Sequence, residues 1–167
     1  VIGHELTHGF DDNGAKFAAD GSYKDWWQQM DKDEFVSKTK ILGETFDAFC
    51  PLPDNCVNSK LTMGENIADL GGVVMGYEAF KKTKQYKKQQ KISGLTPDER
   101  FFHAYGYAWM VNMKDESLVN QIMTDVHAPA QWRINGPLSN MPEFYAAFGI
   151  KQGDAMWKPE NERAKVW

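Results

Sequence analysis

The chain has 167 residues, of which 42% are hydrophobic, and its formal net charge is −4 at pH 7. A chain of this length can bury one good hydrophobic core, so we expect a single domain over residues 1–167. The acidic balance, without a basic stripe, argues against nucleic acid as the main partner. No apolar run approaches the roughly 18 residues of a membrane-spanning helix, and we expect no direct membrane insertion of this chain.

The first predicted element is a helix that runs to about residue 12 and carries the pattern H-E-x-x-H. Its histidines, His4 and His8, lie four residues apart and project from one helix face, where both imidazoles can bind one metal ion. Glu5 follows the first histidine directly, so its carboxylate can reach a water molecule held by that metal. The chain begins inside this helix and without Met, and we expect it to be a piece of a longer protein.

A catalytic zinc site needs a third protein ligand and one open position for water. Metzincins place a histidine six residues after the second one, but Gly14 stands at that position here. Glu65 and Asp69, which share one face of a second predicted helix, are better candidates. Glu65 can complete the metal shell while Asp69 accepts the free N–H of a ligand histidine. Asp11, three residues after His8, either orients an imidazole in the same way or belongs to a turn.

Residues 13–24 are predicted to be irregular, and a helix and a loop follow. Asp25 is the expected N-cap of a helical start at Trp26 and Trp27. From Lys32 onward, apolar residues with a 4-3-4-3 spacing predict a helix that buries one face. These residues are Phe35, Thr39, Leu42, Phe46 and Phe49.

The predicted loop over residues 50–58 contains both cysteines of the chain, Cys50 and Cys56. They either close a small disulfide or stay free, and their spacing is not that of a metal-binding C-x-x-C pair. The two residues alone leave both states open.

The longest predicted helix runs from residue 64 to about residue 86 and has one apolar stripe. The stripe consists of Ile67, Leu70, Val74 and Tyr77. Gly71 and Gly72 weaken this helix but allow another backbone to approach closely, as a crowded metal site requires. The lysine-rich residues 81–91 are either a basic patch for nucleic acid or, as we favour, a solvated helix end.

Residues 96–99 form a capping box with proline at the first helical position. The helix that follows carries an aromatic stripe, which we interpret as core. The stripe consists of Phe101, Phe102, Tyr105 and Trp109. His103 lies in the same helix without a partner motif, and we interpret it as a structural or surface histidine.

A short helix over residues 116–123 is predicted to lead to His127, which precedes a proline-fixed turn. Asp125, two residues earlier, can hold the tautomer of this histidine, although a lone histidine is usually structural. Arg133 offers a rigid fork of five donors for a carbonyl or carboxylate, or else forms a surface ion pair. A last helix is predicted over residues 143–148, and Trp167 is expected to pin the chain end.

Several segments, taken together and in this order, resemble the neprilysin and endothelin-converting-enzyme family of zinc endopeptidases. They are residues 1–14, 64–72, 125–129 and the closing pair 166–167. The resemblance implies a mainly α fold, a zincin-type and thermolysin-like C-terminal catalytic subdomain with helices packed around the H-E-x-x-H helix. Residues 1–167 are then the C-terminal part of a metallopeptidase catalytic domain, and the upstream part of the same polypeptide is one of its partners.

The resemblance also implies a metal and a reaction. One zinc ion per chain is expected on His4, His8 and Glu65. Glu5 is then the general base that helps a zinc-activated water hydrolyse peptide bonds in oligopeptides.

Three further residues receive roles from the resemblance. His127 is expected to donate to the transition state, and Arg133 to clamp a substrate carbonyl. Asp69 is expected to orient an imidazole, the role that Asp11 and Asp125 can also have by their positions near His8 and His127. Family convention also gives Asp69 a catalytic, proton-donating role.

The resemblance points to an extracytoplasmic enzyme, which is periplasmic, secreted or a membrane-anchored ectodomain, with peptides as substrates. In such a compartment we favour a disulfide between Cys50 and Cys56. Met110, Ile150 and Ala164 stand where vertebrate members are expected to have cysteines, which favours a bacterial, oligopeptidase-like member.

Two other functions stay open. The chain could be a non-catalytic fragment or binding module that retains the metal site. It could also belong to another thermolysin-like zinc hydrolase, although the third ligand there ordinarily sits in a local sequence unlike residues 65–69. A zinc assay and a peptide-cleavage test on the full-length protein separate these functions.

Overall fold

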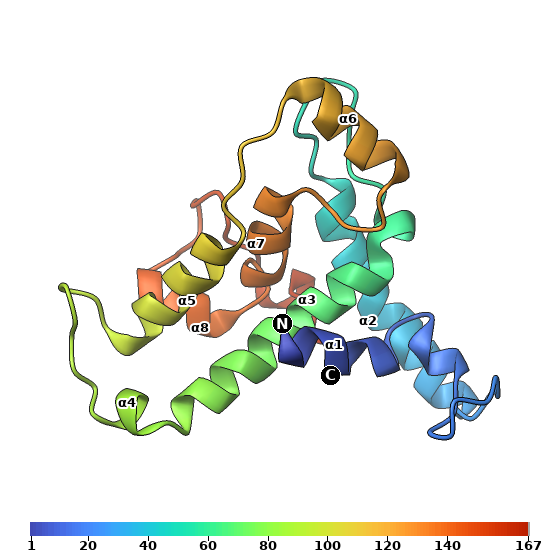
Figure 1. Cartoon of the computed structure of the whole chain (residues 1–167), viewed down its shortest axis with the longest axis horizontal. Coiled ribbons are helices and arrows are strands. Elements are labelled where there is room, and N and C mark those ends of the chain that lie inside the picture. Colours follow the sequence, from blue (N-terminus) through green and yellow to red (C-terminus); the bar gives the residue numbers. More distant parts are fainter. Residues whose placement is uncertain (167) are drawn as a thin grey trace.

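The computed structural model describes residues 1–166, and helices dominate it (Figure 1). The α-helices are α1 (Ile2–Thr7), α2 (Gln29–Asp47), α3 (Ser59–Lys81), α4 (Lys84–Lys87), α5 (Pro97–Ala108), α6 (Asp115–Thr124), α7 (Ala130–Leu138) and α8 (Pro142–Phe148). Short 3-10 helices are η1 (His8–Phe10), η2 (Gly14–Lys16) and η3 (Glu160–Glu162). Within these 166 residues the only β-structure is isolated bridges. The expectation of a mainly α fold is confirmed.

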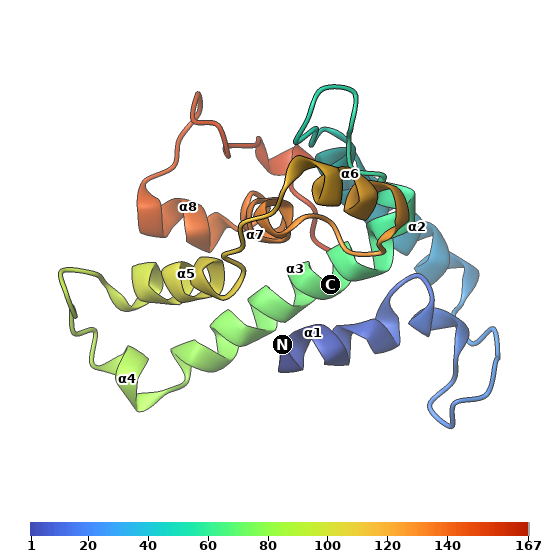
Figure 2. The ribbon, with the colours of Figure 1, turned by 45° about the horizontal axis from the view of Figure 1, so that its top comes forward.

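Helix α3 is the longest and lies at the centre of the arrangement. It contacts α1, α2, α5 and α7. Figure 2 shows α1 on one side of α3, with α5, α7 and α8 on the other. Every element that carries a candidate site residue therefore packs against α3 or joins a helix that does.

The hydrophobic core lies where α2, α3 and α7 meet. Leu42 and Phe46 of α2 and Ile67 of α3 are completely buried. Burying one such side chain stabilises the fold by about 1.5 to 3 kcal/mol. The helix predicted from the 4-3-4-3 spacing is confirmed, although α2 ends at Asp47 and Phe49 lies just beyond it, packed on Trp132.

Two glycines bring α1 unusually close to α3. A Cβ atom on Gly72 would lie 2.7 Å from the backbone nitrogen of His4, and one on Gly71 would lie 2.5 Å from the Thr7 hydroxyl oxygen. Any larger residue would clash with backbone or with a buried side chain. The close approach expected at Gly71 and Gly72 is therefore present, and it sets how near α1 lies to the face of α3 that carries Glu65.

The boundaries of α3 differ from those predicted. The helix begins at Ser59 rather than residue 64, because the Asn58 side chain accepts a hydrogen bond from the backbone nitrogen of Lys60 and caps the start. It ends at Lys81, and Thr83 caps the separate helix α4. The prediction that Val74 belongs to the buried stripe is wrong, since this residue is 40% exposed.

Two predicted helix ends near the N-terminus are also wrong. The first α-helix ends at Thr7, and the chain continues as the 3-10 helix η1 only to Phe10. Asp25 caps nothing: α2 starts after Gln28, which forms a reciprocal capping box with Asp31. A capping box satisfies two backbone donors at once, and so it outweighs the single aspartate.

The C-terminal half follows the predictions more closely. Thr96 and Glu99 form the expected capping box at the start of α5. Helices α6 and α8 lie within one residue of the predicted ranges. His103 is exposed on α5 and touches the Phe148 ring, as expected for a surface histidine. The expectation for Trp167 lies outside the described residues.

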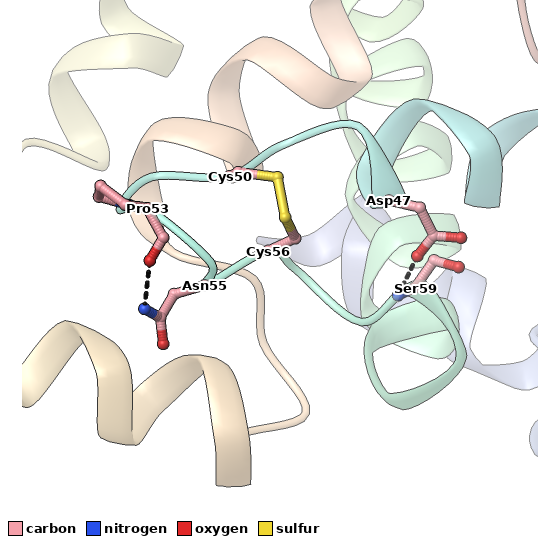
Figure 3. The surroundings of a disulfide bond; sticks show 6 residues. All are labelled: Asp47, Cys50, Pro53, Asn55, Cys56 and Ser59. Atoms are coloured by element: carbon pink, nitrogen blue, oxygen red, sulfur yellow. Dashed lines mark hydrogen bonds between the residues drawn. A yellow bond between two sulfur atoms is a disulfide. The ribbon is translucent and has the colours of Figure 1, made fainter.

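A disulfide joins Cys50 and Cys56, which confirms the favoured pairing (Figure 3). Inside the closed loop the Asn55 side chain donates to the Pro53 carbonyl, at 2.8 Å. Next to it, the backbone nitrogen of Ser59 donates to the Asp47 carboxylate, also at 2.8 Å. The bond between Ser59 and Asp47 ties the end of α2 to the start of α3, the helix that carries Glu65.

None of the helices among residues 1–166 combines the length and the apolar character needed to cross a bilayer.

Candidate metal centre

Three potential metal ligands from two helical segments converge between α1 and α3. The Nε2 atoms of His4 and His8 are 3.0 Å apart. The Glu65 carboxylate lies 3.2 Å from the first of these nitrogens and 3.5 Å from the second. One ligand atom from each residue fits within a group whose members all lie within 4.8 Å of one another. The structure thus brings together the three residues predicted to bind zinc.

The separations fit a tetrahedral zinc site. Zinc bonds of about 2.0 to 2.1 Å to nitrogen or oxygen, at tetrahedral angles, place two ligand atoms roughly 3.3 Å apart. The three observed separations scatter around that value. Two imidazoles and one carboxylate, with a fourth position open, are the ligand set of a catalytic rather than a structural zinc site.

Each of these histidines is held by an aspartate through its other ring nitrogen. His4 Nδ1 donates to Asp69 at 2.8 Å, and His8 Nδ1 donates to Asp11 at 2.7 Å. With the proton on Nδ1, each Nε2 presents a lone pair. Two lone pairs facing each other at 3.0 Å repel unless a cation or a proton lies between them. The arrangement therefore favours a cation at this point.

Asp69 is a buried junction between the metal ligands and Arg133. Its carboxylate accepts from His4 and, through two parallel bonds of 2.7 and 2.8 Å, from the Nε and Nη2 of Arg133. Asp69 is only 3% exposed. The hydrogen bond to Asp69 raises the pKa of His4 above its ordinary value, and this outweighs the opposite effect of burial.

His127 lies on the other side of Glu65, in the segment between α6 and α7. Its Nε2 is 3.1 Å from the Glu65 carboxylate. Asp125 accepts from both the backbone nitrogen and the Nδ1 of His127, at 2.9 and 2.8 Å. The backbone hydrogen bond, followed by the ring contact, lowers the pKa of Asp125. This carboxylate therefore stays charged and accepts the hydrogen bond from the His127 ring.

Glu5 is exposed on α1, directly after His4. Within residues 1–166 its carboxylate makes no hydrogen bond or ion pair, unlike the aspartates around it. It is therefore free to meet a water molecule or a substrate. Two further contacts in this region come from the end of α5 and the residue after it, and no motif in the sequence predicts them. Tyr105 and Trp109 both touch Arg133 and had been interpreted only as core.

Two histidines and a glutamate on packed helical segments, each histidine held by an aspartate, are an arrangement of ligands typical of zinc metallopeptidases. A family model described as peptidase family M13 matches residues 1–164. Neprilysin-2 of Drosophila melanogaster is 37% identical over all of this chain and 22% of its own length. The neutral endopeptidase of Lactobacillus helveticus is 34% identical, over all of this chain and 24% of its own length.

The chain is also similar to a metallopeptidase of known structure. The zinc metalloprotease Zmp1 of Mycobacterium tuberculosis, in complex with an inhibitor, superposes with a TM-score of 0.90 at 35% identity. The match covers 99% of this chain and 26% of that one. The chain belongs to peptidase family M13, and the resemblance to neprilysin is confirmed. The chain spans about a quarter or less of the length of these curated relatives.

Proposed function

We propose that this chain carries the metal centre of a zinc metalloendopeptidase that hydrolyses peptide bonds in oligopeptides. The observation that supports this best is the convergence of His4, His8 and Glu65 on one point at separations suited to zinc. One ion per chain is proposed. When bound, zinc supplies an acidified water, whose pKa falls to about 7, and a Lewis acid for the carbonyl.

The residues of the chain move the protons and hold the substrate. Glu5, which is exposed and unpaired within residues 1–166, accepts a proton from the attacking water and delivers it to the leaving amine. His127, held by Asp125, donates to the carbonyl oxygen as negative charge develops there. Arg133 lies beside Glu65 and clamps a second substrate carbonyl with a donor that Asp69 leaves free.

Asp69 and Asp11 act through the imidazoles that they hold. Asp69 contacts His4 and Arg133 with both of its oxygens, so it fixes two groups at once. Asp11 holds His8 with one oxygen and the turn at residues 13 and 14 with the other. The proton-donating role that family convention gives to Asp69 stays a proposal that rests on the resemblance.

The remaining proposals concern the parent polypeptide. We propose that residues 1–167 are the C-terminal part of its catalytic domain and that an upstream part of the same polypeptide packs on them. A groove of about 770 Å³ on α1 and α3 supports this, because its lining is mainly apolar. Leu6, Val74 and Met75 line it, and each is at least 40% exposed. Because the chain belongs to a family that includes neprilysins, we propose an extracytoplasmic location.

The sharpest test of the proposed function is Glu5→Gln in the full-length protein. General-base catalysis contributes about 10² to 10⁴ in rate, so kcat should fall by at least that factor while zinc content stays near one per chain. Glu116→Gln, at an exposed position on α6, is the matched control and should keep wild-type kcat. Undiminished peptide cleavage by Glu5→Gln would refute the base assignment. Zinc binding without cleavage in the wild type would instead indicate a binding module.

A further inference from the structure

Tyr105 in the last turn of α5 and Trp109, the residue that directly follows α5, both contact Arg133. The Tyr105 hydroxyl donates to the backbone carbonyl of Arg133 at 2.8 Å. The Trp109 ring lies against the guanidinium, whose Cζ is 4.1 Å from the ring centroid. Trp109 is the C-cap of α5 and lies four residues after Tyr105, so the end of α5 contacts both the backbone and the side chain of this one residue.

The contact with Trp109 constrains what Asp69 leaves free. The two parallel bonds to Asp69 hold one edge of the guanidinium, through Nε and Nη2. A plane held along one edge can still tilt about that edge. A ring packed on its face stops this tilt, and 4.1 Å lies well inside the roughly 6 Å range of a cation–π interaction.

The tilt decides where the remaining donors point. Within residues 1–166 the Nη1 of Arg133 has no hydrogen-bond partner, and Nη2 lies 3.5 Å from the Glu65 carboxylate. Nη2 therefore reaches toward the metal centre, and the N–H groups of Nη1 are the donors that remain free. Arg133 itself is only 9% exposed, so a change of tilt would turn these donors toward protein rather than water.

We propose that Trp109 is a positioning residue for Arg133: its indole face fixes the tilt of the guanidinium so that the unpaired N–H groups meet a substrate carbonyl. This inference rests on the proposed role of Arg133 as the carbonyl clamp. It assigns Trp109 to the function of the site rather than to the core stripe of α5.

Two variants of the full-length, zinc-loaded peptidase, Trp109→Leu and Trp109→Phe, distinguish the effect of the aromatic face from the effect of side-chain size. A desolvated cation–π contact of about 1 to 2 kcal/mol corresponds to about 5- to 30-fold in kcat/KM. Trp109→Leu should lose that factor, mainly through a higher KM, with zinc content unchanged. Trp109→Phe keeps a π face and should recover most of the loss. Equal losses in both variants would overturn the inference.

Fluorinated tryptophan at position 109 provides a test that keeps the size of the side chain. Mono-, di- and trifluorinated rings have progressively weaker negative faces, so kcat/KM should fall step by step with fluorine number. Constant kcat/KM across the series would contradict the inference even if Trp109→Leu failed to fold.

Arg133→Lys, measured in parallel, tests the carbonyl clamp of Arg133 separately from the positioning role of Trp109. Lysine cannot reproduce a stacked, two-bonded guanidinium, so this variant should lose activity, and adding Trp109→Leu to it should cost less than a further twofold. Wild-type kinetics for Arg133→Lys would refute the clamp itself. An impaired Arg133→Lys beside an unimpaired Trp109→Leu would leave the clamp standing and reject the role of Trp109.

Discussion

His4 and His8 share one helix face, but the aspartates that hold them come from different parts of the fold. Asp11 lies three residues after His8 and is part of the same turn. Asp69 lies 65 residues after His4, on another helix. The side chain of His4 is 13% exposed and that of His8 is 31% exposed. The chain thus contains one local and one long-range support for the same metal centre.

The two supports differ in what depends on them. The second oxygen of Asp11 accepts hydrogen bonds from backbone nitrogens of the adjoining turn. Asp11 therefore orients only His8 and the turn next to it. Asp69 binds Arg133 as well, so the orientation of a proposed metal ligand and of the proposed substrate clamp depends on one buried carboxylate. A change at Asp69 should therefore weaken metal binding and substrate binding and lower the stability of the fold. A change at Asp11 should mainly weaken metal binding.

Asp69→Asn should have the largest effect on stability. It leaves the buried Arg133 without its charged partner, and breaking such a pair costs about 3 to 5 kcal/mol. The His4 ring also loses its acceptor, which should lower zinc affinity by about 10- to 100-fold. Urea unfolding and zinc titration of the same samples measure both quantities. A loss of zinc affinity alone would show that Arg133 does not depend on this carboxylate.

Gly72→Ala tests the packing that places the long-range support. Its Cβ would lie 2.7 Å from the backbone nitrogen of His4, and forced overpacking costs about 1 to 3 kcal/mol. Gly76→Ala on the same helix is the control, because its Cβ would make an ordinary contact, 3.6 Å from the Phe101 ring. There the helix should gain up to about 1 kcal/mol. Thermal unfolding that ranks the two variants in the reverse order would contradict the close packing of α1 on α3.

Asp11→Asn should have a smaller and more local effect. The asparagine oxygen can still accept from the backbone of the turn, so the free energy of unfolding should change by less than about 1 kcal/mol. The neutral side chain holds His8 less firmly, and zinc affinity should fall by about 10-fold. The KM of the full-length enzyme should stay near that of the wild type. A rise in KM as large as that of Asp69→Asn would remove the distinction between local and long-range support.

The pH dependence of zinc binding gives the finest distinction. The pKa of His4 in the metal-free protein is raised by Asp69. This pair therefore stabilises the metal-free fold below the ordinary histidine pKa, and the contribution is lost as pH rises through the raised value. Zinc requires the neutral ring, so zinc affinity should increase over the same interval. Isothermal titration across pH should show this rise at lower pH in Asp69→Asn than in the wild type. An unchanged profile would show that Asp69 does not control the protonation of His4.

Local patterns predicted much of the centre, because the chemistry lies in short spacings. His4 and His8 are four residues apart, and so are Glu65 and Asp69, so periodicity alone places each pair on one helix face. Long-range contacts are different. The parallel bonds between Arg133 and Asp69 depend on how α7 packs against α3. No residue spacing in the sequence predicts the orientation of these two helices relative to each other.

The ends of some helices and the contact of Trp109 with Arg133 were not predicted, each for a specific reason. Asn58 is a preferred capping residue and marks the start of α3, but the apolar stripe that predicts this helix begins only at Ile67. Trp109 carried the signal of an aromatic stripe, which is usually core. Only the position of Arg133 beneath its ring distinguishes it. Val74 fitted the helical period, yet it faces an open groove rather than the core.

The most direct test of the central claim is anomalous scattering at the zinc edge from crystals of the zinc-loaded protein. A single peak is expected about 2.0 to 2.2 Å from His4 Nε2, His8 Nε2 and one Glu65 oxygen. A peak bound to only one of these histidines, or one outside the reach of Glu65, would contradict the proposed metal centre.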